Sequence, residues 1–420
     1  MAERTASQGW VRRVVLVWLG WAVLLVGYQG WVQDRFDLKR PDNVFDWTGS
    51  WSSGASAARH PYLRSPLLKG HAAWDSEFYI SIALHGYEDP QMRAASPNST
   101  PDAEIAAPKR EHPTWVSLNH AFFPGYPLAM GLIARPLAAL GVDPAGAATL
   151  AGVIVSLIAA LFAMIAIADL ARSDDAPDEG ASGEPLRAAF YLAVWPAAAF
   201  LAQVYSEALF LALSFGALAL LKRDRWGWAA ALAAGAVFTR ATGVLLVVPF
   251  AATWLFAGER RTLPRAVLAL APALAYLVWR WLLGADFDFV ETRYFGRWPF
   301  AVGDSWDAWT EAAQSLVAGA PQARAYYLLE FVGLVAAVAT TVMIWARDKP
   351  LALYGAATLA VVLTSGDALG MHRYALALPS LFLVPAMLGR RPVFDRLWTL
   401  ACSLGLGVEA MLFSFGFWAG

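Results

Sequence analysis

Charged residues make up only 15% of this 420-residue chain, and several that could do chemistry stand beside aromatic residues. A carboxylate can act as the general base for a hydroxyl nucleophile. Arginine and histidine can hold the oxygens of a phosphate, and arginine can do so through two parallel hydrogen bonds. A carboxylate combined with such cations suggests transfer of a group from a phosphate-bearing donor. The candidates are Asp75, Glu77, Glu207, Arg240, His372 and Arg373.

The composition indicates that these residues work in or beside a membrane. Hydrophobic residues make up 58% of the chain. Soluble domains carry about 25% charged residues, and a soluble core stops growing near about 250–300 residues. The 20 Trp and 13 Tyr residues agree with a membrane protein, because amphipathic rings collect at membrane interfaces. A net charge of −1 gives no support for nucleic-acid binding. The single cysteine, Cys402, excludes an intramolecular disulfide.

Apolar runs of roughly 17–25 residues predict an all-α transmembrane bundle of about eleven helices. The run at 14–32 follows basic residues, but it is long and lacks a small-x-small cleavage site. We therefore expect a first transmembrane helix and not a signal peptide. The segment at 123–141 is short and carries Arg135, which predicts an amphipathic helix in the interface. The other predicted spans are 146–170, 187–203, 205–221, 226–241, 243–257, 265–283, 326–346, 350–365, 374–389 and 397–418.

Basic residues in the connecting segments predict the orientation, because cytoplasmic loops are enriched in Lys and Arg. If 123–141 does not span, four basic clusters and the N-terminal arginines fall on one side, which we assign to the cytoplasm. The acidic linker at 173–185 then lies there too. The polar loop at 33–144, the loop at 284–325 and the turns at 203–206, 240–242 and 366–373 face outside. The clusters are Lys222, Arg223 and Arg225; Arg260, Arg261 and Arg265; Arg347 and Lys349; and Arg390, Arg391 and Arg396.

This topology brings the candidate residues to one membrane face, although they are far apart in the sequence. A charge at membrane depth is costly and by default marks a functional site. For each residue taken singly, the alternative is an ordinary interfacial position or an ion pair. Because the site would lie beside lipid, we expect a lipid-linked phosphate donor whose sugar carbon develops oxocarbenium character. The phosphate would leave already ionised, so no general acid is needed.

Three blocks of sequence, in the same order along the chain, resemble motifs of the PIG-V mannosyltransferases. The run WDSEFYISIALHGY at 74–87 resembles the acidic motif of that family. The run AFFPGYPL at 121–128 is similar to the motif that follows it, and YSEALF at 205–210 resembles a third. A weaker match aligns His372-Arg373-Tyr374 and Pro379 with a late segment. The resemblance therefore extends from about residue 70 to about residue 380.

The resemblance implies a fold of the GT-C type, in which the first extracytoplasmic loop carries an acidic motif and juxtamembrane helices. It also implies inverting transfer of a hexose, usually mannose, from a polyprenyl or dolichyl phosphate. Asp75 would be the catalytic base, and Glu77 a second acidic residue that positions the acceptor or tunes the base. His372 and Arg373, together with Arg240, would clamp the donor phosphate.

For three of the remaining candidates for substrate contact, the sequence leaves two roles open. Trp74 is either a ring that stacks on the sugar or an interface anchor. Glu207 is either a site residue or a partner at a helix end. His120 is either a substrate contact or a local hydrogen-bond partner. Tyr374 stands next to the basic pair and is expected to share its site.

Two features of the first loop are interpreted conservatively. The segment between Tyr87 and Ala121 is longer than the family pattern, and we interpret it as a Pro-rich surface insertion; a lid that recognises the acceptor is the alternative. Its Asn98 sequon matters only in a host with N-glycosylation, and the Ala-rich composition favours a bacterial source. The Asp75-x-Glu77 spacing resembles pairs that bind a hard divalent cation. Two carboxylates are few for a metal cage, so we expect neither a metal nor another cofactor.

We therefore expect a single integral membrane domain over 1–420, with the first helix at 14–32, the acidic loop at 33–144 and the rest of the bundle at 145–420. The expected activity is transfer of mannose from a polyprenyl-phosphate donor to a hydroxyl group at the outer face of a bacterial plasma membrane. The acceptor could be a glycolipid, a glycan or a protein. One alternative is a transporter or flippase for a lipid-linked sugar, although clear internal repeats and midplane polar residues are missing. Another is a GT-C enzyme for a different sugar.

Overall fold

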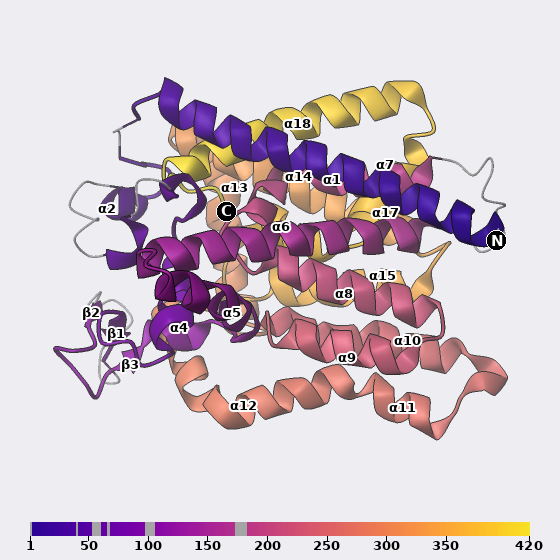
Figure 1. Ribbon diagram of the computed structural model, residues 1–420, viewed down its shortest axis with the longest axis horizontal. Coiled ribbons are helices and arrows are strands. Elements are labelled where there is room, and N and C mark those ends of the chain that lie inside the picture. Colours follow the sequence, from indigo (N-terminus) through magenta and orange to yellow (C-terminus); the bar gives the residue numbers. More distant parts are fainter. Residues whose placement is uncertain (1, 39–40, 53–59, 65–67, 97–105, 173–182) are drawn as a thin grey trace.

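The computed structural model of the protein describes residues 2–38, 41–52, 60–64, 68–96, 106–172 and 183–420. Within these residues the chain is mostly helical and has very little strand, which confirms the predicted all-α class. Long helices lie side by side along the longest axis of the molecule, and a small sheet with short helices sits at one end (Figure 1). Asn98 and most of the acidic linker at 173–185 lie outside the described residues.

Four described helices are long and apolar enough to cross a membrane: α1 (Ala2–Arg35), α6 (Pro144–Ala171), α14 (Pro321–Ile344) and α18 (Pro392–Ser414). Three bent pairs raise this number to seven if each pair is one span. They are α7 (Glu184–Val194) with η4 (Pro196–Ala202), α11 (Leu263–Ala269) with α12 (Ala271–Phe289) and η7 (Val290–Tyr294), and α16 (Met371–Tyr374) and η8 (Ala375–Ala377) with α17 (Ser380–Leu388).

The remaining helices are shorter. Each of the eleven predicted segments coincides with a helix or a bent pair, but several are too short to meet the length criterion, so eleven spans stay a prediction. The shorter helices are α2 (Thr48–Ser52), η1 (Pro61–Leu63), η2 (Lys69–His71), α4 (Ser76–His85), η3 (Leu118–Ala121), α5 (Gly125–Ala139), α8 (Glu207–Lys222), α9 (Trp226–Val237), η5 (Ala241–Leu246), α10 (Val247–Phe256), η6 (Gly258–Arg260), α13 (Val302–Ala318) and α15 (Lys349–Leu363).

The sheet is small and antiparallel, with the strand order β2-β1-β3. It comprises β1 (Arg93–Ala95), β2 (Ala106–Pro108) and β3 (Val116–Ser117). All three strands come from the long polar loop that follows α1. This loop therefore folds into a compact layer over one end of the bundle, together with α2 and α4 (Figure 1).

Local signals in the sequence account for several helix starts. Asp143 caps α6 by accepting a hydrogen bond from the Gly146 N–H at 2.9 Å, and Pro144 follows at the first helical position. Asp348 caps α15 in the same way, accepting from the Leu351 N–H at 3.0 Å. Such caps satisfy donors that a helix start otherwise leaves without a partner.

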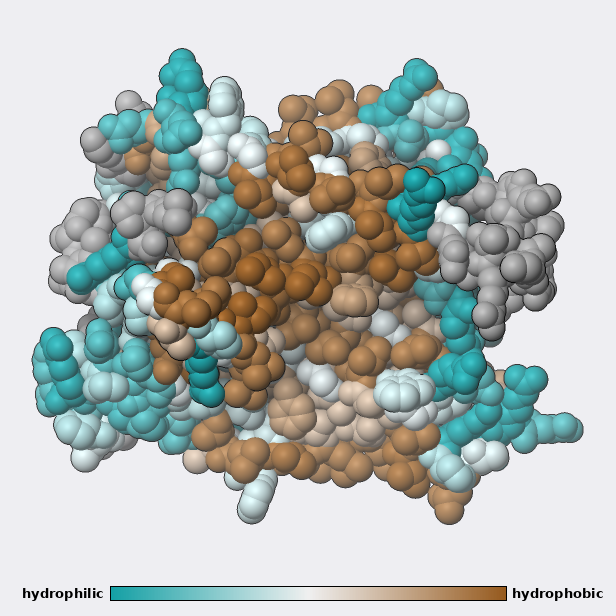
Figure 2. All heavy atoms as spheres, in the orientation of Figure 1, coloured by the Kyte–Doolittle hydropathy of each residue, from teal (hydrophilic) through white to brown (hydrophobic). Residues whose placement is uncertain are grey.

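On the face of the molecule drawn in Figure 2, hydrophobic residues form a broad band between two more hydrophilic ends. Large apolar side chains on α1, α12 and α14 are strongly exposed, among them Leu24 at 73%, Trp281 at 84% and Val335 at 66%. Soluble proteins rarely expose continuous apolar surface on this scale. Lipid is the solvent that fits such a surface, so the structure supports an integral membrane protein.

The predicted basic clusters meet at one end of the bundle, which we call the basic end. Glu184 pairs with Arg347 at 2.5 Å and with Arg390 at 2.8 Å. Arg265 pairs with Asp224 at 2.5 Å, beside the cluster at 222–225. Lys222 donates to the Leu170 carbonyl and Arg347 to the Ala171 carbonyl, so two of the clusters contact the end of α6 and the ion pairs above link the other clusters to them. Assignment of this end to the cytoplasm stays a prediction.

The glycine of the run at 121–128 permits a close contact between two backbones. The Gly125 N–H donates to the Phe238 carbonyl at 2.6 Å, where α5 begins against the end of α9. A Cβ at Gly125 would lie 2.7 Å from that same carbonyl oxygen. The following Tyr126 is fully buried, and its hydroxyl donates to the Gly152 carbonyl at 3.0 Å. This run therefore fixes α5 against α6 and α9.

We expect Gly125→Ala to destabilise the protein by about 1–3 kcal/mol, because overpacking against backbone cannot be relieved by a side-chain rotation. Gly27→Ala, at a position with no heavy atom within 4 Å of an added Cβ, is the matched control. Thermal unfolding of both variants in detergent measures the difference. Equal unfolding temperatures would show that the Gly125 contact relaxes freely.

Candidate functional site

Asp75 lies at the start of α4, at the end of the bundle opposite the basic end. The preceding Trp74 has a φ of 53°, a left-handed conformation that is uncommon for a bulky residue and turns the chain sharply into the helix. The Asp75 N–H donates to the Tyr205 hydroxyl at 3.1 Å. The Asp75 carboxylate does not cap α4, and it is 33% exposed. The backbone at Asp75 is thus fixed while its carboxylate stays accessible.

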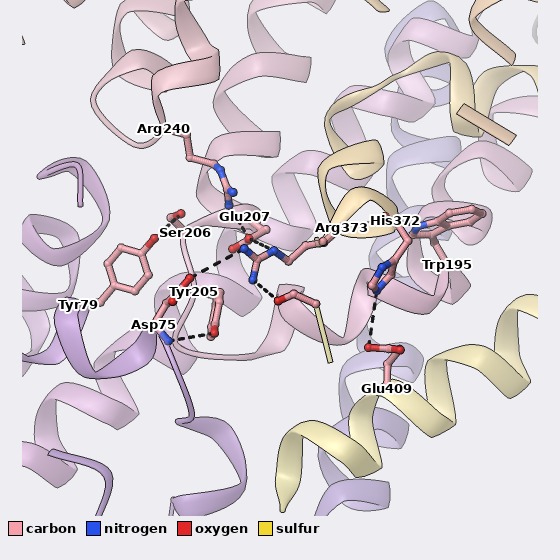
Figure 3. Close-up of polar contacts among 12 residues, drawn as sticks. Asp75, Tyr79, Trp195, Tyr205, Ser206, Glu207, Arg240, His372, Arg373 and Glu409 are labelled. Atoms are coloured by element: carbon pink, nitrogen blue, oxygen red, sulfur yellow. Dashed lines mark hydrogen bonds and ion pairs between the residues drawn. The ribbon is translucent and has the colours of Figure 1, made fainter. Parts of the chain in front are cut away.

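Two arginines and one buried glutamate stand next to this carboxylate (Figure 3). Arg373 Nη2 lies 3.9 Å from Asp75 Oδ2, and Arg373 Nε lies 3.4 Å from Glu207 Oε1. Arg240 forms an ion pair with the same Glu207 oxygen. One buried carboxylate is therefore shared by two guanidinium groups, which leaves positive charge beside Asp75. This residual charge suits an anionic ligand.

Two cavities meet at Asp75. The first has a volume of about 390 Å³ and the second about 280 Å³. Both are lined by Asp75, Phe295, Arg297, Arg373 and Tyr374. A molecule bound in one cavity can therefore meet a molecule bound in the other at the Asp75 carboxylate.

Aromatic rings form one wall of the first cavity. Trp47, Trp51, Trp74 and Trp418 line it, and Trp74 packs edge-on to Trp418 at a centroid distance of 5.1 Å. The Trp74 Nε1–H donates to the Phe417 carbonyl at 3.2 Å, which fixes the ring. Flat aromatic surfaces with polar neighbours are suited to stacking on sugar rings. The sequence-predicted Trp74 thus lies in the site.

The second cavity is bordered by apolar residues of α12 and α15. Tyr276 and Phe287 line it from α12, and Val361 and Val362 line it from α15. Arg240 belongs to this cavity and not to the first one. The second cavity therefore combines a cation with walls that suit a hydrocarbon chain.

Arg297 is a functional candidate that the sequence reasoning missed. It lines both cavities, and its buried Nε has no hydrogen-bond partner among the described residues. Burial opposes its charge, but the neighbouring Tyr374, Glu291, Asp367 and Asp75 raise the pKa of Arg297 above its ordinary value. It lies alone in the loop after η7, so no neighbouring motif residue marks it in the sequence.

Asp367 also lines the first cavity, whereas the ion pairs of Arg373 are formed with Asp75 and Glu207. Its carboxylate accepts from the N–H groups of Ala368 at 2.6 Å and Leu369 at 3.1 Å. Burial raises the pKa of Asp367 above its ordinary value, although Arg297 and these hydrogen bonds act in the opposite direction. Its hydrogen bonds hold the turn that precedes α16.

The structure does not bring Glu77 to either cavity. Its carboxylate is 1% exposed and lies 2.6 Å from His60 Nδ1 and 3.6 Å from Arg93 Nη2. Residues two positions apart on a helix do not face each other, so Asp75 and Glu77 point in different directions. Glu77 therefore acts on the site only through its partners.

His372 is likewise turned away from Asp75, toward Glu409 (Figure 3). It is fully buried, with Nδ1 3.0 Å from Glu330 and Nε2 3.7 Å from Glu409. Glu330 also accepts from the backbone N–H groups of Gly370 at 2.7 Å and His372 at 2.8 Å. This network ties α14 to α16, the short helix that carries Arg373.

We expect Glu330→Gln to cost about 3 kcal/mol of stability, because it breaks the closer of two buried ion pairs and leaves His372 with only the Glu409 carboxylate, 3.7 Å away. Glu259→Gln, at an exposed position in η6, is the control. Thermal unfolding in detergent measures both. An unchanged unfolding temperature for Glu330→Gln would show that His372 is neutral and needs no counter-ion.

His120 lies outside both cavities, in a polar cluster at the edge of the first loop. Its Nε2 is 2.8 Å from Glu88 Oε1, and Lys109 pairs with the same carboxylate. Burial opposes the charge on Glu88, but these two hydrogen bonds lower its pKa below the ordinary value. The structure thus places His120 in the local hydrogen-bonding role considered from the sequence. Tyr374, in contrast, lines both cavities.

The described residues contain no group of three or more His, Cys, Asp and Glu side chains that could hold a metal ion. Asp75 and Glu77 do not form a pair, since Glu77 is held by His60 and Arg93.

Comparisons with known proteins agree with the sequence motifs. Residues 109–255 match the family model described as Mannosyltransferase (PIG-V), a range that includes the runs at 121–128 and 205–210. The chain is 33% identical to the GPI alpha-1,6-mannosyltransferase 2 of Mus musculus over 42% of this chain and 29% of that protein. It is 31% identical to the Cricetulus griseus protein of the same name over 51% of this chain and 36% of that protein.

The similar segment thus spans only about a third of the length of these curated relatives. Among solved structures, the oligosaccharyltransferase of Archaeoglobus fulgidus, tethered to an acceptor peptide, matches with a TM-score of 0.47 and 12% identity. This match covers 98% of the present chain and 55% of the other. The resemblance to PIG-V mannosyltransferases that the motifs predict is confirmed by the family match.

Proposed function

We propose that the protein is a membrane glycosyltransferase that moves mannose from a polyprenyl-phosphate donor to a hydroxyl acceptor. One observation carries the proposal. An accessible carboxylate, Asp75, lies where an aromatic cavity meets an apolar cavity that contains Arg240. The similarity to mannosyltransferases supports the choice of sugar. The proposal includes the GT-C type of architecture that the motifs imply.

The donor occupies the second cavity in this proposal. Its prenyl chain lies between α12 and α15, and its phosphate lies at Arg240, Arg373 and Arg297. Guanidinium groups bind phosphate oxygens through paired hydrogen bonds, and they stabilise negative charge that grows on the leaving group. The mannose then extends toward Asp75, where the two cavities join.

The acceptor occupies the first cavity, with its sugar against the tryptophan wall. Asp75 removes the proton from the attacking hydroxyl. The acceptor oxygen forms a bond to the anomeric carbon as the bond from that carbon to the phosphate oxygen breaks. The electron pair leaves with the phosphate, which needs no proton. Because the acceptor and the leaving group lie in different cavities, attack from the opposite face inverts the anomeric carbon.

Three predicted site residues take indirect roles in this scheme. Glu77 holds His60 and Arg93 in the wall of the first loop. His372 holds the helix that carries Arg373, through Glu330 and Glu409. Glu207 orients both arginines of the donor site. The active site lies at the end of the bundle opposite the basic end. Because the basic end is predicted to be cytoplasmic, the active site is proposed to face the outside of the plasma membrane.

The test is a donor panel on the purified protein in nanodiscs, with host membrane lipids as the acceptor source. We expect radiolabelled mannose to pass from polyprenyl-phosphate-mannose into a lipid or glycan product, and not from GDP-mannose. EDTA is expected to leave the rate unchanged, because no step requires a metal. Transfer from GDP-mannose alone would contradict the proposal, and transfer from polyprenyl-phosphate-glucose alone would correct the sugar.

A further inference from the structure

We propose that the first cavity contains a second anion subsite, formed by Arg93 and Arg293, that binds a negatively charged group on the acceptor. This inference rests on the proposed function and deepens it. It assigns the acceptor to an anionic class, a sugar that carries a phosphate or a carboxylate near the reacting hydroxyl.

The charge of the first cavity is the first argument. Four arginines line it, Arg93, Arg293, Arg297 and Arg373, against only two acidic residues, Asp75 and Asp367. Arg373 faces Asp75 and Glu207, and Arg297 borders the donor cavity. Arg93 and Arg293 line only the first cavity and not the donor cavity. Binding of the donor phosphate therefore does not explain why these two arginines are present.

The fixed position of Arg93 is the second argument. Its guanidinium carbon lies 4.6 Å from the centre of the Trp51 ring and 5.7 Å from that of Phe78. Arg93 comes from β1, and the two rings come from α2 and α4. A guanidinium stacked on aromatic rings keeps its edge available for planar hydrogen bonds to an oxyanion. The group is thus oriented before any ligand binds.

The hydrogen bonding of Arg93 remains incomplete without a ligand. Its Nη1 donates weakly to the Tyr294 hydroxyl at 3.4 Å, and its Nε has no hydrogen-bond partner among the described residues. Glu77 lies 3.6 Å from Nη2, but that carboxylate already binds His60 at 2.6 Å. A ligand oxyanion would supply the acceptor that this guanidinium lacks.

Arg293 is the second cation of the subsite and lines the same cavity as Arg93. It precedes Tyr294 in η7, and Tyr294 contacts Arg93. Arg293 is exposed, and no ion pair is found for it among the described residues. Phe78, which Arg93 covers, lies three residues after Asp75, so the subsite is about one helical turn from the base. An acceptor could therefore place its anion here and its hydroxyl at Asp75.

Equilibrium dialysis on the full chain in neutral-lipid nanodiscs tests the subsite. The donor site is first filled with polyprenyl phosphate, so that the probes report only the first cavity. The probes are radiolabelled methyl α-mannoside, its 6-phosphate and the corresponding methyl mannuronate. We expect at least tenfold tighter binding of one or both charged probes, and the tighter of the two identifies the anion as phosphate or carboxylate.

The variants Arg93→Gln and Arg293→Gln are each expected to reduce this preference to less than threefold. Arg293→Gln is informative even if Arg93→Gln does not fold, because Arg293 is exposed. Arg240→Gln should keep the preference while weakening the binding of polyprenyl phosphate. The proposal is overturned if the charged and neutral probes bind with equal affinity, or if none of them binds. It is also overturned if Arg293→Gln and a folded Arg93→Gln both keep the full preference for the charged probes. Charged-probe binding without any mannose transfer would leave the subsite intact and contradict the proposed function.

Discussion

Asp75→Asn is expected to reduce mannose transfer by roughly 10²–10⁴-fold, the contribution of a positioned general base. The asparagine side chain has nearly the same shape but cannot accept the proton of the attacking hydroxyl. The Asp75 backbone N–H, which donates to Tyr205, is kept. The rate of transfer from polyprenyl-phosphate-mannose, measured at saturating donor, gives the effect.

The control for this variant is Asp307→Asn, at an exposed position on α13 away from both cavities. Both variants should unfold at the temperature of the unaltered protein, because the Asp75 carboxylate caps no helix. Binding of polyprenyl phosphate should also be retained in Asp75→Asn. A variant that folds, binds the donor and still transfers mannose at an undiminished rate would show that another group is the base.

Arg373→Gln is expected to lower kcat by about a hundredfold or more, since preorganised groups that stabilise charge on a leaving group are each worth about 10²–10³ in rate. Arg373 is the guanidinium between Asp75 and Glu207 and lines both cavities. Its loss removes positive charge where the phosphate leaves. Initial rates over a matrix of donor and acceptor concentrations separate this effect on kcat from an effect on KM.

Arg373→Lys should recover only part of the rate, because lysine keeps the charge but not the planar pair of donors. Arg324→Gln, at an exposed position on α14, is the matched control and should leave the rate unchanged. If Arg373→Gln raised only the KM for the acceptor, the arginine would belong to acceptor binding. The donor phosphate would then have to be held by Arg240 and Arg297 alone.

The lengths of the apolar runs predicted where the helices lie. The basic clusters predicted which helix ends lie together. The eleven predicted segments all coincide with helices, because a long apolar run forms a helix with its own backbone hydrogen bonds in lipid. Glu184, Arg347 and Arg390 meet at one end, as the cluster pattern required. The exact number of spans could not be predicted, because breaks such as the 82° bend between α7 and η4 depend on packing against other helices.

Of the residues that the sequence singled out, Asp75, Trp74, Arg240, Arg373 and Tyr374 line one or both cavities, and Glu207 pairs with Arg240 and Arg373. Two other candidates, which stand close to these residues in the sequence, line neither cavity. Glu77 is two residues after Asp75, and His372 is one residue before Arg373. Helical rotation of about 100° per residue turns neighbouring side chains to different faces. A sequence-based argument that applied this rule would have separated these pairs.

The sequence by itself indicated the class of protein and the run of helices, and it singled out Asp75 as the candidate base. Only the tertiary structure decided what surrounds that base. Arg93 and Arg297 carry no motif, and they reach the site because β1 and the loop after η7 fold over the same end of the bundle. Contacts between residues two hundred positions apart, such as Arg93 with Tyr294, arise from packing and leave no periodic trace along the chain.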